Sequence, residues 1–178
     1  SSVTFTNQAG AAFGTFYAKY CTISNERAMF AHVRDPSSTL KHVIVGSERD
    51  NYTKITVANR PSSSLGTGDP FFLIAPDLKP INGLVDAFGS MLFSTEKGRL
   101  FNLTGTNAQD FAIADFYAGS AASGEESLAY VGNDVIYGRQ GRLESVKDTD
   151  RFGDSEADDI TFSIADEIAG YTGWRTIY

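Results

Sequence analysis

The sequence has little of the residue types that carry covalent and metal chemistry: one cysteine, two histidines and two methionines in 178 residues. The single cysteine, Cys21, excludes an intrachain disulfide. No cysteine or carboxylate stands at metal-ligand spacing from His32 or His42, so both histidines are expected to be structural. The longest apolar runs fall far short of the roughly 20 residues that a membrane-spanning helix needs. These shortages exclude a disulfide scaffold and a transmembrane helix, and they indicate no histidine–cysteine metal centre.

Basic residues are also scarce. The chain has 15 Lys and Arg against 22 Asp and Glu, which gives a formal net charge of −7. A nucleic-acid-binding surface needs clustered cations that neutralise phosphates. The composition therefore argues against nucleic acid as a direct ligand.

Catalytic signatures are missing as well. The sequence has no Gly-x-Ser-x-Gly elbow, no phosphate-binding loop and no dinucleotide fingerprint. Cys21 lies between Tyr20 and Thr22 on an expected strand, so it is interpreted as a small packed hydrophobe rather than a nucleophile. We expect no enzymatic activity and no cofactor.

What the sequence does have is typical of an all-β protein. Its 42% hydrophobic content is that of a globular chain, and 17 glycines separate short bursts of Phe, Tyr, Ile and Val. No window keeps helical periodicity over four turns, and only residues 157–168 could form a short helix. The expected strands outside the repeat described below are residues 15–23, 28–33, 40–45, 53–57 and a buried strand at 71–75.

Residues 89–103 align without a gap to residues 132–146, at an offset of 43. A β-rich unit that repeats every 40–45 residues or so is typical of one four-stranded propeller blade, which must pack against its neighbours to bury its apolar surface. Hairpin turns are expected at Gly89, Gly98, Gly132 and Gly141, with three antiparallel strands assigned to each repeat. The clearest repeats span residues 84–126 and 127–169.

The sequence therefore predicts antiparallel blades that form a β-propeller or an arc of one. Residues 1–178 are expected to be a single propeller-like domain or an excerpt of a larger propeller. Residues 60–70 are rich in Ser, Gly and Pro, and they are interpreted as an inserted binding loop or a connector.

Two segments of the second half are more specific than blade-like sequence in general: Asp148-Thr-Asp-Arg-Phe-Gly-Asp154 with Asp158-Asp159, and Gly173-Trp-Arg-Thr-Ile-Tyr178. Together with the repeat, they make residues 83–177 resemble the β-propeller tail nozzle or stabilisation proteins of short-tailed bacteriophages and prophages. The first 80 residues do not take part in this resemblance.

The resemblance implies a structural virion protein, made in the cytoplasm of the bacterial host. It implies a sixfold homo-oligomeric ring below the portal and adaptor, in contact with other tail proteins, through which DNA leaves. An acidic channel surface would let DNA pass because like charge repels phosphate. No membrane partner is expected.

Six carboxylates lie within twelve residues at Asp148, Asp150, Asp154, Glu156, Asp158 and Asp159. Against the calcium-loop template, Asp148, Asp150, Asp154 and Asp159 are weak candidate ligands, because Phe152 stands where an oxygen ligand is required. A solvated acidic loop, held by Arg142 or Arg151 and with Asp158 or Asp159 capping a short helix, is the favoured alternative.

In the nozzle interpretation this acidic segment is expected to be mobile in the isolated chain. The candidate assembly contacts are then Asp148, Asp150, Arg151, Asp154, Asp158, Asp159 and Trp174.

A competing interpretation is a ligand-binding propeller that recognises a glycan on a host surface. Its candidate site combines Tyr117, Tyr171 and Trp174 with the 61–70 loop.

Overall fold

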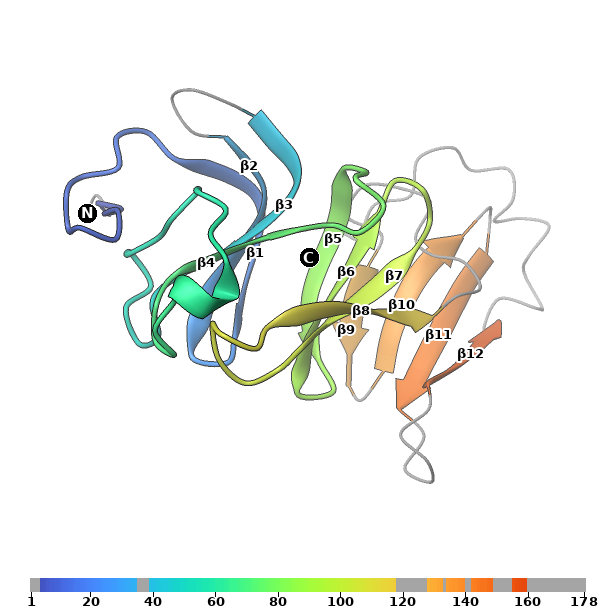
Figure 1. The fold of residues 1–178 in the computed structure, drawn as a ribbon. Coiled ribbons are helices and arrows are strands. Elements are labelled where there is room, and N and C mark those ends of the chain that lie inside the picture. Colours follow the sequence, from blue (N-terminus) through green and yellow to red (C-terminus); the bar gives the residue numbers. More distant parts are fainter. Residues whose placement is uncertain are drawn as a thin grey trace. The chain divides into compact units, whose positions relative to one another are not determined.

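The computed structural model describes residues 4–34, 39–117, 128–132, 134–139, 142–148 and 155–159. Within these residues the chain forms three four-stranded antiparallel sheets, and the strands of each sheet follow one another in chain order (Figure 1). The predicted all-β character is confirmed. No helix in the described part of the chain is long and apolar enough to cross a membrane.

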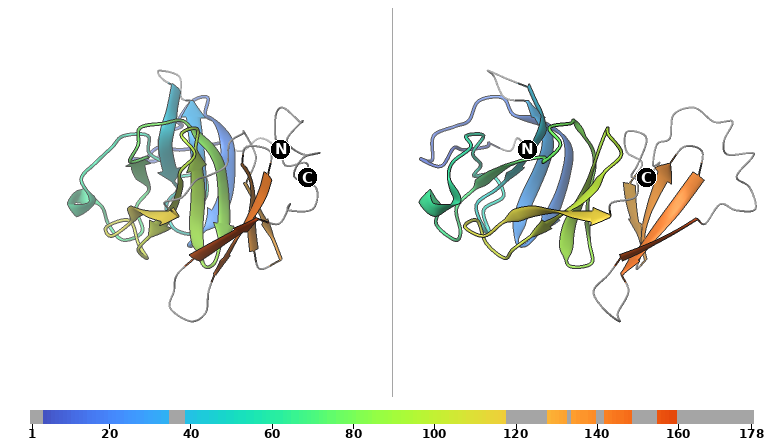
Figure 2. Two further views of the ribbon diagram at one scale, coloured as in Figure 1. Left: turned by 90° about the vertical axis from the view of Figure 1, so that its right-hand side faces the viewer. Right: turned by 45° about the vertical axis from the view of Figure 1, so that its right-hand side comes forward.

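The first sheet consists of β1 (Tyr17–Ser24), β2 (Arg27–Arg34), β3 (Thr39–Gly46) and β4 (Phe71–Ile74). The second consists of β5 (Ile81–Ala87), β6 (Ser90–Thr95), β7 (Leu100–Thr104) and β8 (Ala112–Tyr117). The third, coloured orange to red in Figure 2, consists of β9 (Leu128–Val131), β10 (Asp134–Arg139), β11 (Arg142–Asp148) and β12 (Ser155–Asp159). A 3-10 turn (Ser62–Ser64) interrupts the connection between β3 and β4.

The strands of the second and third sheets recur at the offset that the sequence repeat gives. Gly89 and Gly132 lie in the turns of the corresponding first hairpins, and Gly98 lies between β6 and β7; all three have positive φ. The glycine takes a different position in the two turns: Gly89 is the second residue after β5, whereas Gly132 is the first residue after β9. Each repeat contains a fourth strand, β8 or β12, that the sequence pattern did not assign. Gly141 lies outside the described residues.

The chain divides into two compact units. Unit 1 contains residues 1–81 and 103–114, and unit 2 contains residues 82–102 and 115–178. In unit 1, buried Val33, Val43 and Val45 of the first sheet share a core with Ile55. Phe5, Phe13 and Phe16 of the N-terminal segment pack against this core, as do other partly buried residues. Thr6 holds the segment in place through backbone hydrogen bonds with Thr53 and Ile55.

In unit 2, the second and third sheets pack on each other. Their shared core contains Leu92 and Leu100 from the second sheet and Leu128, Val135 and Tyr137 from the third. The two sheets approach each other closely at Gly83, where a Cβ atom would lie 3.0 Å from the Cβ of Leu128. A glycine at this point of β5 therefore lets the two sheets meet.

Several sequence-based expectations are wrong. Residues 53–57 do not form a strand; Lys54 makes only an isolated bridge to Thr6. Residues 157–159 belong to β12 rather than to a helix. Residues 160–168 lie outside the described part, so capping of a short helix by Asp158 or Asp159 stays a prediction. Cys21 is exposed rather than packed, because it lies on the outer face of the edge strand β1. The strand at Phe71–Ile74 is present, although only its first residue is buried.

Candidate functional site

The predicted acidic segment is only partly described. Asp148 ends β11, and Asp158 and Asp159 lie in β12, where they pair with Ser145 and Glu144. Residues 155–159 thus pair in a sheet, whereas the expected mobility of the segment in the isolated chain stays a prediction. Asp150, Arg151, Asp154, Tyr171 and Trp174 lie outside the described residues, as does the side chain of Tyr117. Within the described residues, no group of three or more His, Cys, Asp and Glu side chains could hold a metal ion.

A different site emerges at one end of the first sheet, around Arg27. This residue follows the tight β1–β2 turn, in which Asn25 and Glu26 both have positive φ. Its side chain is 1% exposed. The guanidinium donates hydrogen bonds to the backbone carbonyls of Ser47 at 2.5 Å, Thr67 at 2.8 Å, Gly68 at 3.2 Å and Asp69 at 2.8 Å. One buried cation therefore holds two separate loops.

Aromatic rings complete the surroundings of the guanidinium. The Arg27 Cζ atom lies 5.6 Å from the ring centre of Phe71 and 5.7 Å from that of Phe111, and the two rings are themselves in contact. Burial lowers the pKa of Arg27 below its ordinary value and nearby Arg49 lowers it further, while the carboxylates of Asp69 and Glu48 act in the opposite direction. Arginine keeps its proton in proteins even so, and the charge is stabilised by carbonyl dipoles and ring faces.

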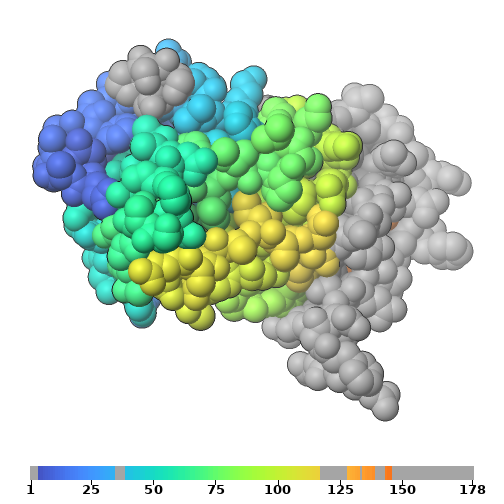
Figure 3. All heavy atoms as spheres, in the orientation of Figure 1, coloured from blue at the N-terminus to red at the C-terminus, as the bar shows by residue number. Residues whose placement is uncertain are grey.

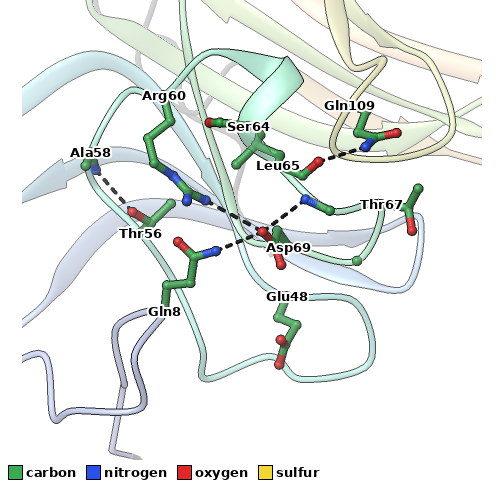
Figure 4. Close-up of polar contacts among 12 residues, drawn as sticks. Gln8, Glu48, Thr56, Ala58, Arg60, Ser64, Leu65, Thr67, Asp69 and Gln109 are labelled. Carbon is green, nitrogen blue, oxygen red and sulfur yellow. Dashed lines mark hydrogen bonds and ion pairs between the residues drawn. The ribbon is translucent and has the colours of Figure 1, made fainter.

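The connection at residues 60–70 is organised by Asp69 (Figure 4). Its carboxylate accepts hydrogen bonds from the Gln8 side chain at 2.8 Å and from the backbone N–H of Gly66 at 3.1 Å. The Arg60 guanidinium lies 3.9 Å away as an ion pair. This segment is thus a tightly held connector between β3 and β4 with an exposed outer surface.

A second loop, residues 104–111, joins the first. The Gln109 side chain donates to the Leu65 carbonyl at 2.8 Å, and the Ala108 N–H donates to the Thr67 carbonyl at 3.2 Å. The two loops adjoin at the surface, teal-green and yellow in Figure 3.

Asp110 closes the second loop by accepting hydrogen bonds from the backbone N–H groups of Asn107 and Thr106. These hydrogen bonds hold the pKa of Asp110 below its ordinary value. We call the set formed by residues 24–27, 47–54, 60–70 and 104–111 the Arg27 loop cluster.

The surface of this cluster is polar and close to neutral overall. Its ion pairs join Arg49 to Glu26 and Lys54 to Glu48, so the charges largely balance. Ser62, Ser63 and Thr67 are exposed, and their hydroxyls make no hydrogen bond within the described residues. A surface of fixed loops with free hydroxyls can recognise a neutral polar ligand or a protein partner.

Sequence reasoning identified residues 60–70 but not Arg27. The acceptors of Arg27 lie 20 to 42 positions away along the chain, so no local pattern marks this residue.

No known protein-family model matches the chain, and no curated protein is similar to it.

Proposed function

We propose that the chain is a structural protein of a bacteriophage tail, in the position of a nozzle or head–tail stabilisation component. It works without enzymatic activity and without a cofactor. Copies of it form a ring around the channel through which DNA leaves the virion, in contact with the portal, the adaptor and other tail proteins.

The observation that carries this proposal is the succession of three four-stranded sheets, each with its strands in chain order. The second and third sheets follow the 43-residue repeat and share one core through Leu92, Leu128 and Val135. Sheets that repeat and pack in this way support a β-propeller or an arc of one, the architecture of the proteins that residues 83–177 resemble. The net charge of −7 suits a channel wall past which DNA slides.

Electron microscopy of phage particles tests this function directly. An antibody raised against the chain, applied to particles induced from the source strain, is expected to label the tail below the portal, and peptides of the chain are expected in purified particles. Particles that contain no such peptide would overturn the proposal. An antibody against a capsid protein serves as the labelling control.

The Arg27 loop cluster favours a second candidate function, recognition of a glycan. Loops that display Ser62, Ser63 and Thr67 on a fixed backbone offer hydroxyls to a hydroxyl-rich ligand without further ordering cost. On a glycan array, binding that is lost in a Ser63→Arg, Thr67→Arg variant of unchanged stability would support this function. An array without hits would reject it.

A further inference from the structure

Arg60 carries two buried hydrogen-bond donors that no acceptor of the described chain satisfies. Its Nε and Nη2 atoms, which we call the Arg60 fork, are both buried, and neither donates a hydrogen bond within the described residues. The Asp69 carboxylate lies 3.9 Å from Nη2, which is beyond hydrogen-bond distance. No other described residue has two such atoms. Because buried donors without an acceptor cost free energy, an acceptor brought by a ligand would stabilise them.

The fork is held in place close to the surface. In the 3-10 turn that follows Arg60, the Ser64 hydroxyl donates to the Pro61 carbonyl at 2.8 Å. The guanidinium points toward Asp69 (Figure 4). Since 28% of the Arg60 side chain and 31% of the Asp69 side chain are exposed, the pair lies at the surface rather than in the core. A ligand therefore reaches the fork from the exposed side of this pair.

Acceptors stand beside these donors. The Oδ2 atom of Asp69 accepts from Gln8 at 2.8 Å and from Gly66 at 3.1 Å, whereas Oδ1 accepts no hydrogen bond from the part of the chain that the structure describes. A hydroxyl oxygen about 2.8 Å from both Nη2 and Oδ2 fits within their separation of 3.9 Å. The charges of Arg60 and Asp69 cancel. The pair therefore suits a group that both accepts and donates, as a hydroxyl does.

The fork has a second requirement, because Nε–H and Nη2–H are parallel and fixed in one plane. Two neighbouring oxygen atoms satisfy both donors at once. Hydroxyl groups on adjacent carbons of a sugar ring supply two such oxygens, and each also carries a proton that it can donate. One hydroxyl can then donate to Asp69 while both accept from Arg60.

We propose that Arg60 and Asp69 bind two adjacent hydroxyl groups of a neutral sugar. This inference rests on the second candidate function, glycan recognition by the Arg27 loop cluster, and it names the atoms that hold the sugar. Nε and Nη2 of Arg60 donate to the two oxygens, and one of the hydroxyls donates to the Asp69 carboxylate. Ser62 and Ser63 follow in the same connector and are exposed, so their hydroxyls can contact the rest of the ring.

Water and a carboxylate are the rival occupants of the fork. Water satisfies the same donors, so a sugar binds only if its hydroxyls reproduce those hydrogen bonds and the ring adds further contacts. A carboxylate would satisfy both donors but would lie next to Asp69, which repels it. The exposed cations Arg49 and Lys54 of the cluster are paired with glutamates and do not offset this repulsion. Adjacent hydroxyls therefore fit the fork better than an anion does.

NMR on the full chain, labelled with nitrogen-15, tests the inference through the Nε–H resonance of Arg60. The probes are the methyl glycosides of glucose, galactose and mannose, together with any glycan that the array identifies. We expect at least one probe to shift this resonance and to saturate with a Kd of roughly 1–10 mM. The deoxy analogue that lacks one hydroxyl of the pair should bind about tenfold more weakly or worse, because it leaves one donor unpaired.

Two substitutions of Arg60 test the fork itself. Arg60→Met should weaken binding by about tenfold or more, and Arg60→Lys should do the same, because an ammonium group keeps the charge but lacks the fork. Arg49→Met is the matched control, since it removes an exposed arginine that is paired with Glu26 in the same loop cluster. It should bind like the unaltered chain. Circular dichroism and the Tm establish that each variant is folded.

The outcomes separate this inference from the functions on which it builds. An equal loss in Arg49→Met, full affinity in Arg60→Lys, or tighter binding of glucuronate than of methyl glucoside would overturn it. Binding that is lost in Ser63→Arg, Thr67→Arg but kept in Arg60→Met would also overturn it and leave glycan recognition by the cluster standing. If neither the array nor the methyl glycosides show binding, glycan recognition and this inference fail together. The virion function is tested separately, by tail labelling.

Discussion

At the scale of the single residue, Arg27 is completely buried and has no carboxylate in direct contact. These two features are rarely found together in an arginine. Its charge is balanced by four backbone carbonyls and by the faces of Phe71 and Phe111. Backbone carbonyls left without a donor in such a place would each be costly. The residue therefore stabilises unit 1 mainly by donating hydrogen bonds to backbone carbonyls of two loops.

Replacing Arg27 with methionine should lower the free energy of unfolding by about 3–5 kcal/mol, because the carbonyls of Ser47 and Asp69 lose their donor and those of Thr67 and Gly68 lose one of two. Urea unfolding followed by fluorescence measures the loss. Arg99→Met is the control, since Arg99 forms an exposed ion pair with Asp115 and lies over the Phe101 ring without donating to a buried carbonyl, so its removal should cost about 1 kcal/mol or less. Equal losses in the two variants would show that the carbonyl contacts contribute little.

Asp110 provides a prediction about pH. Backbone hydrogen bonds from Asn107 and Thr106 favour its ionised form and depress its pKa in the folded chain. Such a group stabilises the fold above its unfolded pKa of about 3.9, and that contribution is lost as pH falls through the lower folded value. The amide resonances of Thr106 and Asn107, followed by NMR, should titrate with a midpoint below about 3.9. In the Asp110→Asn variant this titration should disappear, and a midpoint above the ordinary value would contradict the hydrogen bonding.

At the scale of elements, the positions of several strands could be predicted from the local sequence pattern. The contacts that strands and loops make with residues distant in the sequence could not. Alternating apolar residues and positive-φ glycines located β6, β10 and β11, because turn chemistry and side-chain alternation act over a few residues. The strand expected at 53–57 is absent: Ile55 packs against Val33 and Val43, which lie far away in sequence, and the backbone of this segment bonds to Thr6 of the N-terminal segment instead of joining a sheet. Arg27 and the Arg27 loop cluster were missed for the same reason, since their contacts are long-range.

The packing of the second sheet on the third predicts a cost for any side chain at position 83. In Gly83→Ala the new methyl group would lie 2.8 Å from the Ser94 hydroxyl oxygen and 3.0 Å from the Leu128 Cβ, so one strand must shift. We expect a loss of about 1–3 kcal/mol in the free energy of unfolding. Gly68→Ala is the matched control, because no atom lies within 4 Å of its added Cβ, and its effect should stay within about 0.5 kcal/mol. A neutral Gly83→Ala would mean that the sheets are not in close contact there.

At the scale of the whole molecule, most of the acidic residues lie in unit 2, and this distribution has a consequence for stability. Fifteen carboxylates against seven cations in unit 2 repel one another, and salt screens this repulsion. For dilute, monomeric protein, raising NaCl from about 20 to about 300 mM should therefore raise the Tm by about 2–5 °C. Differential scanning fluorimetry measures the change. The rise should be smaller in Glu156→Gln, Asp158→Asn, Asp159→Asn, and a fall in Tm would show that attractive ion pairs dominate instead.

The N-terminal segment has a consequence for the apolar face of the first sheet. Phe5, Phe13 and Phe16 lie against the core formed by Val33, Val43 and Val45, so residues of the same chain already occupy that face. Any other element that packed there would first have to displace these three rings, and the burial that it gained would be offset by the burial that the rings lost.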